Sequence, residues 1–115
     1  MKDCIFCKII AGEINSKKYY EDDEMIIIQD IAPQAKKHYI LIPKHHYCDI
    51  IEMSSDDALI LGKCIKKLSL LVTSLGLDNG FRIVSNKGPD ACQSVNHLHI
   101  HVLGGEQLTP HCGKK

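Results

Sequence analysis

Residues 96–105 read NHLHIHVLGG and place three histidines at alternate positions, with apolar residues between them. Side chains alternate between the two faces of a β-strand, so this spacing predicts a strand over residues 97–103 with one histidine face and one apolar face. Same-face neighbours lie about 6.5 to 7 Å apart, which places His97 and His101 too far apart to hold one metal ion together. The row therefore favours divided roles, such as one histidine on a metal and the others at a reaction centre.

The segments around this strand predict the rest of an antiparallel sheet. Residues 24–30 and 38–44 are rich in β-branched or aromatic residues and are separated by a turn-prone stretch, which predicts an antiparallel pair. Residues 80–86 are predicted as a further strand, and the long polar loop 87–96 joins it to the histidine strand. A loop of that length beside a histidine-bearing strand suggests a functional role.

Two helices complete a compact α+β domain. A short helix is predicted over residues 3–11, and a long amphipathic helix over residues 55–75 has Ser54 and Asp57 at capping-box spacing and Gly76 as its stop. The residues of the short helix predicted to face inward are Ile5, Phe6, Ile9 and Ile10. Those of the long helix are Ala58, Leu61, Ile65, Leu68, Val72 and Leu75.

The length of 115 residues fits one domain, residues 1–115. The charge balance favours a small and specific partner. Lys plus Arg and Asp plus Glu both number 14, so the zero formal charge predicts no general attraction to nucleic acid or to a membrane surface. The first residues carry a charge and a cysteine instead of the apolar run of a secretory signal, and no membrane span is predicted. The six cysteines are fewer than a secreted disulfide scaffold carries, which predicts reduced thiols and a cytoplasmic location.

The stretch HLHIHVL matches the pattern His-φ-His-φ-His-φ-φ, with φ apolar, and the chain thereby resembles the histidine triad (HIT) superfamily. The resemblance runs from about residue 4 to residue 105 and includes CIFCKIIAGEI, QDIAPQAKKHYILIPKHH and VSNKGPDACQSVNHLHIHVLGG. The chain is most similar to the small Hint branch of purine nucleoside phosphoramidases. The nucleotidyltransferase branch has Gln at the position of His101, which favours a hydrolase here. The resemblance implies a HIT-like fold, with a sheet of about five strands, and a homodimer.

The resemblance also implies a reaction. His99 holds the middle motif position and would be the nucleophile that takes the nucleotidyl group from a phosphoramidate, after which water releases the nucleoside monophosphate. His101, His38 and Asn86 match positions around the α-phosphate, and Ser94 matches a hydroxyl near the departing amine. That amine leaves easily only when protonated, so His101 or Ser94 is expected to deliver a proton. The second ring nitrogen of His99 must donate to an acceptor, which in the family is a backbone carbonyl.

A purine nucleotide is the implied ligand, and the scheme requires no magnesium. The chain has no GxxxxGK[ST] loop for a triphosphate. Asp30 matches an acidic residue that hydrogen-bonds the ribose, and apolar residues match walls of the base pocket, although plain core packing explains them equally well. Ile28 stands where an aromatic residue is common, which predicts weaker base stacking. The nucleotide contacts implied by the family are Asp30, Ile31, Asn86, Gln93, Ser94, Ile5, Phe6, Ile9, Ile28, His99 and His101.

Cys4 and Cys7 form a Cys-x-x-Cys pair. Taken alone, the pair is compatible with redox chemistry, half of a metal site or free reduced thiols, although no strand precedes it as in a thioredoxin-like site. The family resemblance supplies His46, of Pro-Lys-x-His, and His97, and so implies a structural Cys2His2 zinc site. This assignment leaves the other two triad histidines free. Ordinary or solvated side chains are predicted for Cys48, Cys64, Cys92 and His45.

Two departures from the family and several rival functions bear on the assignment. Cys92 stands where a glycine often precedes Gln-Ser, and residues 106–115, EQLTPHCGKK, lack an aromatic residue found near the end of some relatives.

The nearest alternative activity is hydrolysis of dinucleoside polyphosphates. The alternatives from other classes are a nucleotide-binding regulatory module with little turnover and a zinc-stabilised scaffold with structural histidines.

Overall fold

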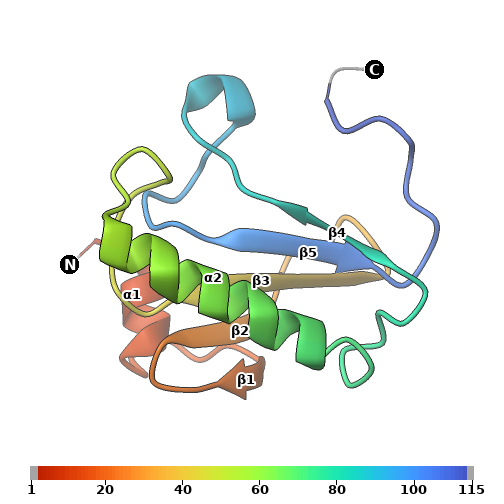
Figure 1. Cartoon of the computed structure of the whole chain (residues 1–115), viewed down its shortest axis with the longest axis horizontal. Coiled ribbons are helices and arrows are strands. Elements are labelled where there is room, and N and C mark those ends of the chain that lie inside the picture. Colours follow the sequence, from red (N-terminus) through yellow and green to blue (C-terminus); the bar gives the residue numbers. More distant parts are fainter. Residues whose placement is uncertain (1–2, 114–115) are drawn as a thin grey trace.

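An antiparallel sheet of five strands organises the chain, and the computed structural model describes residues 3–113 of it. The strands follow the spatial order β1-β2-β3-β5-β4. Their bounds are Lys18–Glu21 (β1), Met25–Gln29 (β2), Lys37–Pro43 (β3), Phe81–Val84 (β4) and Ile100–Gly104 (β5). The helical segments are α1 (Ile5–Ile10), α2 (Ser55–Leu70) and the 3-10 turn η1 (Pro89–Ala91). Helix α2 runs across one face of the sheet, and α1 lies on the far side of it (Figure 1).

The central strands are buried on both faces, because each face is covered by a helix. Alternate residues of β2, β3 and β5 pack against α2, and this core includes Met25, Ile27, Leu41, Leu61, Leu68, Ile100 and Val102. The residues between them pack against α1, and this second core includes Phe6, Ile9, Ile26, Ile28, Ile40 and Ile42. His101 lies between Ile100 and Val102 and pairs with Ile40 in the register, so the histidine face is the face covered by α1.

The predicted α+β class, the antiparallel five-stranded sheet, the long helix and the short N-terminal helix are confirmed. The capping box is also present, because Ser54 Oγ accepts from the backbone N–H of Asp57 and the Asp57 carboxylate accepts from the N–H of Ser54. Helix α2 has 16 residues, and no helix between residues 3 and 113 is long and apolar enough to cross a membrane.

The predicted strand 97–103 begins three residues later than expected, at Ile100. The reason is a competing partner: the backbone N–H of Leu98 donates to the carbonyl of Tyr47 at 2.7 Å, instead of continuing the ladder with β3. His97 and His99 consequently lie in irregular chain before the strand, and only His101 lies in β5 itself.

The predicted helix 55–75 ends at Leu70, because the chain tightens into turns that finish at Gly76, whose φ of +73° suits glycine. The prediction of which residues of this helix face inward was also partly wrong. Ala58 and Ile65 are exposed, and Cys64 takes a place in the core that the predicted spacing had missed. In α1, Ile5 is exposed while its neighbours Phe6 and Ile9 are buried.

Two buried tyrosines in the core beneath α2 differ by one hydrogen bond. Tyr39 Oη donates to the carbonyl of Leu75 at 2.6 Å. Tyr47 is equally buried, but its hydroxyl has no hydrogen-bond partner within the described part of the chain. Burial raises the pKa of Tyr47 to about 12, so the group stays a neutral phenol. An unpaired buried hydroxyl destabilises a fold by about 1–3 kcal/mol, whereas a paired one does not.

Removing these two hydroxyls should therefore have opposite effects. Tyr39→Phe should lower the free energy of unfolding by about 1–2 kcal/mol, because the Leu75 carbonyl loses its donor. Tyr47→Phe should leave it unchanged or raise it by up to about 1 kcal/mol. Urea denaturation of both variants measures the difference, and equal losses would contradict the assignment of an unpaired Tyr47 hydroxyl.

Candidate functional site

The three triad histidines lie together beneath α1 but in different degrees of burial. His97 is completely buried and His99 nearly so, whereas 22% of the side chain of His101 is exposed. The edge of the Phe6 ring packs against both buried histidines, with centroid distances of 6.0 Å to His97 and 5.0 Å to His99. Phe6, predicted as a wall of the base pocket, thus supports the histidine rings directly.

One ring nitrogen of His99 is fixed by the backbone. Its Nδ1 lies 2.8 Å from the carbonyl oxygen of His97, and because a carbonyl can only accept, Nδ1 carries the proton. The Nε2 atom is then an unprotonated lone pair. Burial lowers the pKa of His99, which keeps the ring neutral at physiological pH. A neutral imidazole in this tautomer is equipped for nucleophilic attack.

His38, His101 and Asp30 form a second connected group. The backbone N–H of Gln34 donates to His38 Nδ1 at 3.0 Å, so the proton of His38 resides on Nε2. That Nε2 lies 2.9 Å from His101 Nδ1 and 3.2 Å from Asp30 Oδ2. When His38 donates to His101, the remaining proton of His101 is on its own Nε2. The chain of contacts thereby makes Nε2 of His101 a hydrogen-bond donor.

Cys4, Cys7, His46 and His97 converge on a single point, with their ligand atoms all within 4.8 Å of one another. The Nδ1 atoms of the two histidines are 3.1 Å apart. Cys4 Sγ lies 3.4 Å from His97 Nδ1, and Cys7 Sγ lies 3.3 Å from His46 Nδ1 and 3.6 Å from His97 Nδ1. A tetrahedral zinc ion with two Cys and two His ligands requires N···N edges of about 3.3 Å and N···S edges of about 3.5 Å. The four side chains therefore fit such an ion, and each is of a type that zinc prefers.

The ring of His97 is oriented to present a lone pair to this point. Its Nε2 lies 2.8 Å from the carbonyl of Pro43 and must carry the proton, which leaves Nδ1 unprotonated. Burial lowers the pKa of His97 to about 4, so the ring is neutral near pH 7. The backbone carbonyl of His97 also accepts the Nδ1 proton of His99. His97 therefore belongs to the metal-type cluster, formed by Cys4, Cys7, His46 and His97, and at the same time orients His99.

The loop before β5 is tied down by Gln93. Its side-chain oxygen accepts from the N–H of Gly88, and its nitrogen donates to the carbonyls of Cys48 and Val95. The side chain predicted to contact nucleotide is therefore engaged within the loop. Cys92, the departure from glycine, has a φ of +58° in the left-handed region that favours glycine. A side chain is disfavoured in this region, so the turn at Cys92 has a conformational cost.

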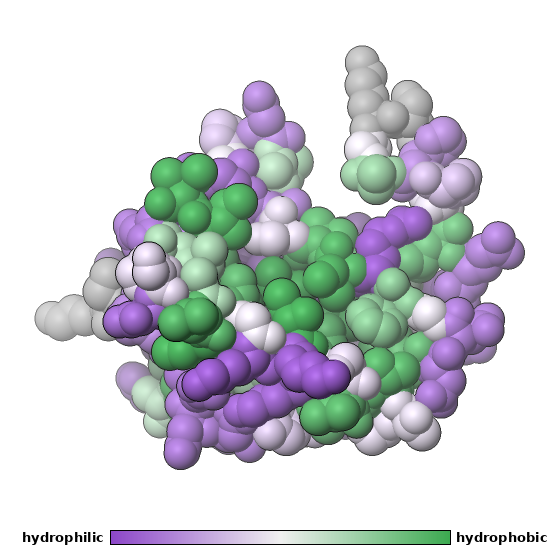
Figure 2. All heavy atoms as spheres, in the orientation of Figure 1, coloured by the Kyte–Doolittle hydropathy of each residue, from purple (hydrophilic) through white to green (hydrophobic). Residues whose placement is uncertain are grey.

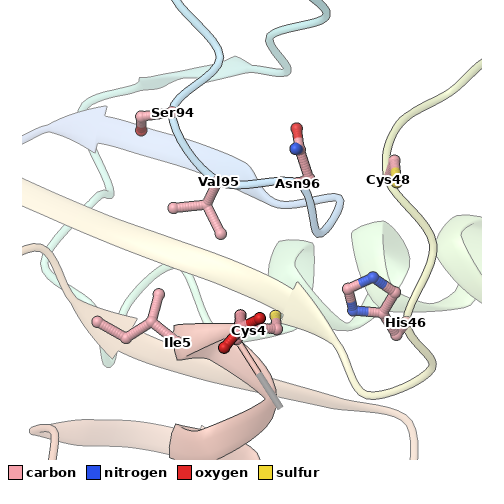
Figure 3. Close-up of a pocket in the computed structure, with 8 residues that line it drawn as sticks. Cys4, Ile5, His46, Cys48, Ser94, Val95 and Asn96 are labelled. Carbon is pink, nitrogen blue, oxygen red and sulfur yellow. The ribbon is translucent and has the colours of Figure 1, made fainter. Parts of the chain in front are cut away.

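A hollow of about 580 Å³ opens beside α1, and Figure 3 shows the residues around it. Ser94, Val95 and Asn96 form one side, and Cys4, Ile5, His46 and Cys48 come from the other. The hollow adjoins the metal-type cluster, and its lining, as far as the structure describes it, lacks His99, His101 and Asp30. Of the predicted catalytic residues, Ser94 alone lines it.

The other residues predicted to contact the nucleotide differ in how far their side chains are exposed. Phe6, Ile9 and Ile28 are buried in the core beneath α1, whereas Ile5 is exposed and Ile31 is 96% exposed. Such a completely exposed isoleucine beside Asp30 is available to a ligand. Asn86 lies two residues beyond the end of β4, whose last register pair joins Val84 to His101.

Three groups that orient the histidines are backbone atoms: the carbonyls of His97 and Pro43 and the N–H of Gln34. No residue pattern marks such groups, because every residue offers a carbonyl. His45, predicted to be a solvated neighbour, is exposed but pairs with Asp57 at 2.6 Å, which links this segment to the first turn of α2.

Comparison with known proteins places these features in context. The family described as "Scavenger mRNA decapping enzyme C-term binding" matches residues 3–115. A 14 kDa zinc-binding protein of Brassica juncea is 44% identical over 108 residues, which cover 92% of this chain and 96% of that protein.

Solved structures agree with this match. The crystal structure of a HIT family hydrolase from Legionella pneumophila Philadelphia 1 superposes with a TM-score of 0.91 at 38% identity, covering 96% of this chain and 100% of the other. A histidine triad nucleotide-binding protein from Candida albicans gives a TM-score of 0.78 at 36% identity, covering 87% and 73% of the two chains.

Proposed function

Because the chain belongs to the histidine triad superfamily, we propose that it is a nucleotide hydrolase that cleaves purine nucleoside 5′-phosphoramidates to the nucleoside monophosphate and an amine. The observation that carries the proposal is the His99 ring, neutral and with its Nδ1 proton held by the His97 carbonyl. A hydrolase and a nucleotide-binding protein among the structural relatives support the reaction type and the class of ligand.

In the first step the lone pair of His99 Nε2 attacks phosphorus and the P–N bond breaks. The amine leaves with a proton from His101 Nε2 or from the Ser94 hydroxyl. In the second step water attacks the nucleotidyl-histidine, the bond between phosphorus and His99 breaks, and the water proton returns to the group that protonated the amine. His99 is thereby restored as a neutral imidazole.

The group of Asp30, His38 and His101 supports both steps in this proposal. His38 is held by the Gln34 N–H and directs the Nε2 proton of His101 outward, where it would stabilise the charge on the phosphate oxygens. Asp30 would bind the ribose hydroxyls, and the exposed Ile31 would contact the purine. Asn86, in the chain just beyond β4, would donate to the phosphate.

Cys4, Cys7, His46 and His97 would hold a structural zinc ion in this proposal, as suggested by their geometry and by the zinc-binding relative. The ion would tie α1 to the chain just before β5, and no magnesium enters the scheme. Thiolate ligands at such a centre would accord with a reducing, cytoplasmic location.

Replacement of the nucleophile tests the proposed reaction. His99→Ala should lower turnover of adenosine 5′-phosphoramidate by at least about 1000-fold, while AMP binding measured by calorimetry is largely retained. Rapid quenching of the wild-type reaction should trap a nucleotide on His99. Exposed His111 provides the control, and His111→Ala should leave turnover unchanged. Substantial activity in purified His99→Ala would remove this residue from the covalent role.

The choice of substrate separates the rival functions. Faster hydrolysis of diadenosine polyphosphate than of the phosphoramidate would identify a dinucleoside polyphosphate hydrolase instead. Binding of AMP with no turnover of either substrate would identify a nucleotide-binding module, and absence of AMP binding would identify a scaffold.

Metal analysis tests the proposed zinc centre. Protein purified under reducing conditions without chelators should contain near one zinc per chain, and Cys4→Ser combined with Cys7→Ser should remove it and lower the thermal midpoint. Cys48→Ser serves as the matched control, because Cys48 lines the neighbouring hollow but lies outside the cluster. Turnover should fall less than in His99→Ala. A zinc-free wild-type protein would refute the centre and leave the histidine chemistry standing.

We further propose a homodimer formed by the face of α2 and the edge strand β4. Phe81 and Ile83 of β4 are more than 40% exposed and share the α2 side of the sheet with Val102, the register partner of Ile83. Figure 2 shows hydrophobic side chains gathered between α2 and β4. Lys67 of α2 reaches Asp22 in the hairpin before β2, so Ala58 and Ile65 lie on the side of α2 toward β4.

A second copy on this face would account for the apolar helix positions that are exposed in one chain. Ile83→Glu should therefore convert a dimer to a monomer in light scattering. Leu70→Glu is the matched control, because Leu70 is 73% exposed on α2 but lies opposite the core side. A monomeric wild-type protein, or equal dissociation by both variants, would contradict the proposed interface.

A further inference from the structure

Cys4 and Cys7 form a close dithiol in addition to being candidate metal ligands. Cys4 immediately precedes α1, and the backbone N–H of Cys7 donates to Cys4 Sγ at 3.3 Å, which turns that sulfur toward the helix. The two sulfur atoms lie within 4.8 Å of each other. Two residues separate the cysteines, which is the spacing of dithiol pairs that form and break disulfides.

A solvent path leads to this dithiol. Cys4 lines the hollow beside α1 together with the exposed polar residue Asp3. Figure 3 shows two further exposed polar residues, Ser94 and Asn96, on the opposite side of the hollow. Cys4 is 9% exposed and Cys7 is half-buried, so a small polar oxidant can reach the pair from the hollow. Cys64, by contrast, is completely buried in the core and has no such access.

We infer that Cys4 and Cys7 are a peroxide-sensitive modification site, at which oxidation to a disulfide expels the bound metal ion. The inference rests on the zinc centre proposed above. A disulfide between the two sulfurs removes half of the four ligands at once, and His46 and His97 alone do not complete a tetrahedral site.

The chemistry needs only a hydroperoxide as oxidant. The Cys4 thiol gives up its proton, the resulting thiolate attacks one peroxide oxygen and the O–O bond breaks; Cys4 becomes a sulfenic acid, and the departing hydroxide takes up the proton and leaves as water. The Cys7 sulfur then attacks the Cys4 sulfur, the S–O bond breaks, and a second water departs. In sum, two thiols and one hydrogen peroxide yield one disulfide and two waters, so the dithiol is oxidised by two electrons and the peroxide is reduced.

Loss of the ion acts on the histidine site through His97. The ring of His97 would lose its partner at Nδ1 but keep its hydrogen bond to the Pro43 carbonyl and its contact with Phe6. The carbonyl that holds His99 would therefore be loosened but not removed. We expect metal loss to be complete and the loss of turnover to be partial.

The test uses the full chain with its metal bound. Zinc-loaded protein is freed of reductant and treated with a few equivalents of hydrogen peroxide, while a chromogenic chelator records released zinc and mass spectrometry maps the cysteines. The expected result is release of the bound zinc, a mass lower by two hydrogen atoms and a Cys4–Cys7 disulfide peptide. Thiol reductant followed by zinc should restore the starting state. Cys48→Ser should behave like the wild type.

The possible results distinguish failure of the redox inference from failure of the proposed metal centre. Zinc that is present and stays bound, or cysteines that proceed to sulfinic acid without a Cys4–Cys7 disulfide, would overturn the redox inference alone. Protein that contains no zinc before oxidation would overturn it together with the metal centre. Cys7→Ser gives an independent check, because without Cys7 a sulfenic acid on Cys4 should accumulate and react with dimedone; modification confined to Cys92 or Cys112 would contradict the inference.

Discussion

The hydrogen bond from His99 Nδ1 to the carbonyl of His97 is the contact on which the site depends. It selects the tautomer of His99, and so decides which nitrogen has a free lone pair. The carbonyl can serve only if His97 is immobile, and its ring is held by Pro43, by Phe6 and by the cluster with Cys4. The cluster of Cys4, Cys7, His46 and His97 and the neutral His99 ring are thus joined through His97 into one structural unit.

The doubly covered sheet makes this unit rigid. The central strands bury alternate residues under α2 and under α1, so His97 and His99 are enclosed by packed side chains instead of facing water. Enclosure keeps the rings neutral by burial, which lowers the pKa of His97, His99 and His101 alike. The same helix that covers the histidines brings Cys4 and Cys7 to them, so the location of α1 determines both burial and ligand geometry.

Much of this was predictable from the sequence, because period and motif record which side chains share a face. The sheet, both helices and the convergence of Cys4 with His97 followed from spacing or from the family resemblance. The backbone acceptors did not, since a carbonyl has no residue identity. The departure of residues 97–99 from the ladder depends on a tertiary partner, Tyr47. Periodicity also placed Ile65 in a core, although a single chain leaves it exposed.

The metal-type cluster joins residues that are far apart along the chain, with Cys4 and His97 separated by 93 positions. Closing so long a loop is entropically unfavourable until the sheet between its ends has formed. During synthesis the two thiols leave the ribosome well before His97 does, so the cluster can assemble only after most of the chain has been made. Binding of a metal ion at this cluster would consequently be a late event in biogenesis, and a filled site would mark a chain that has finished folding.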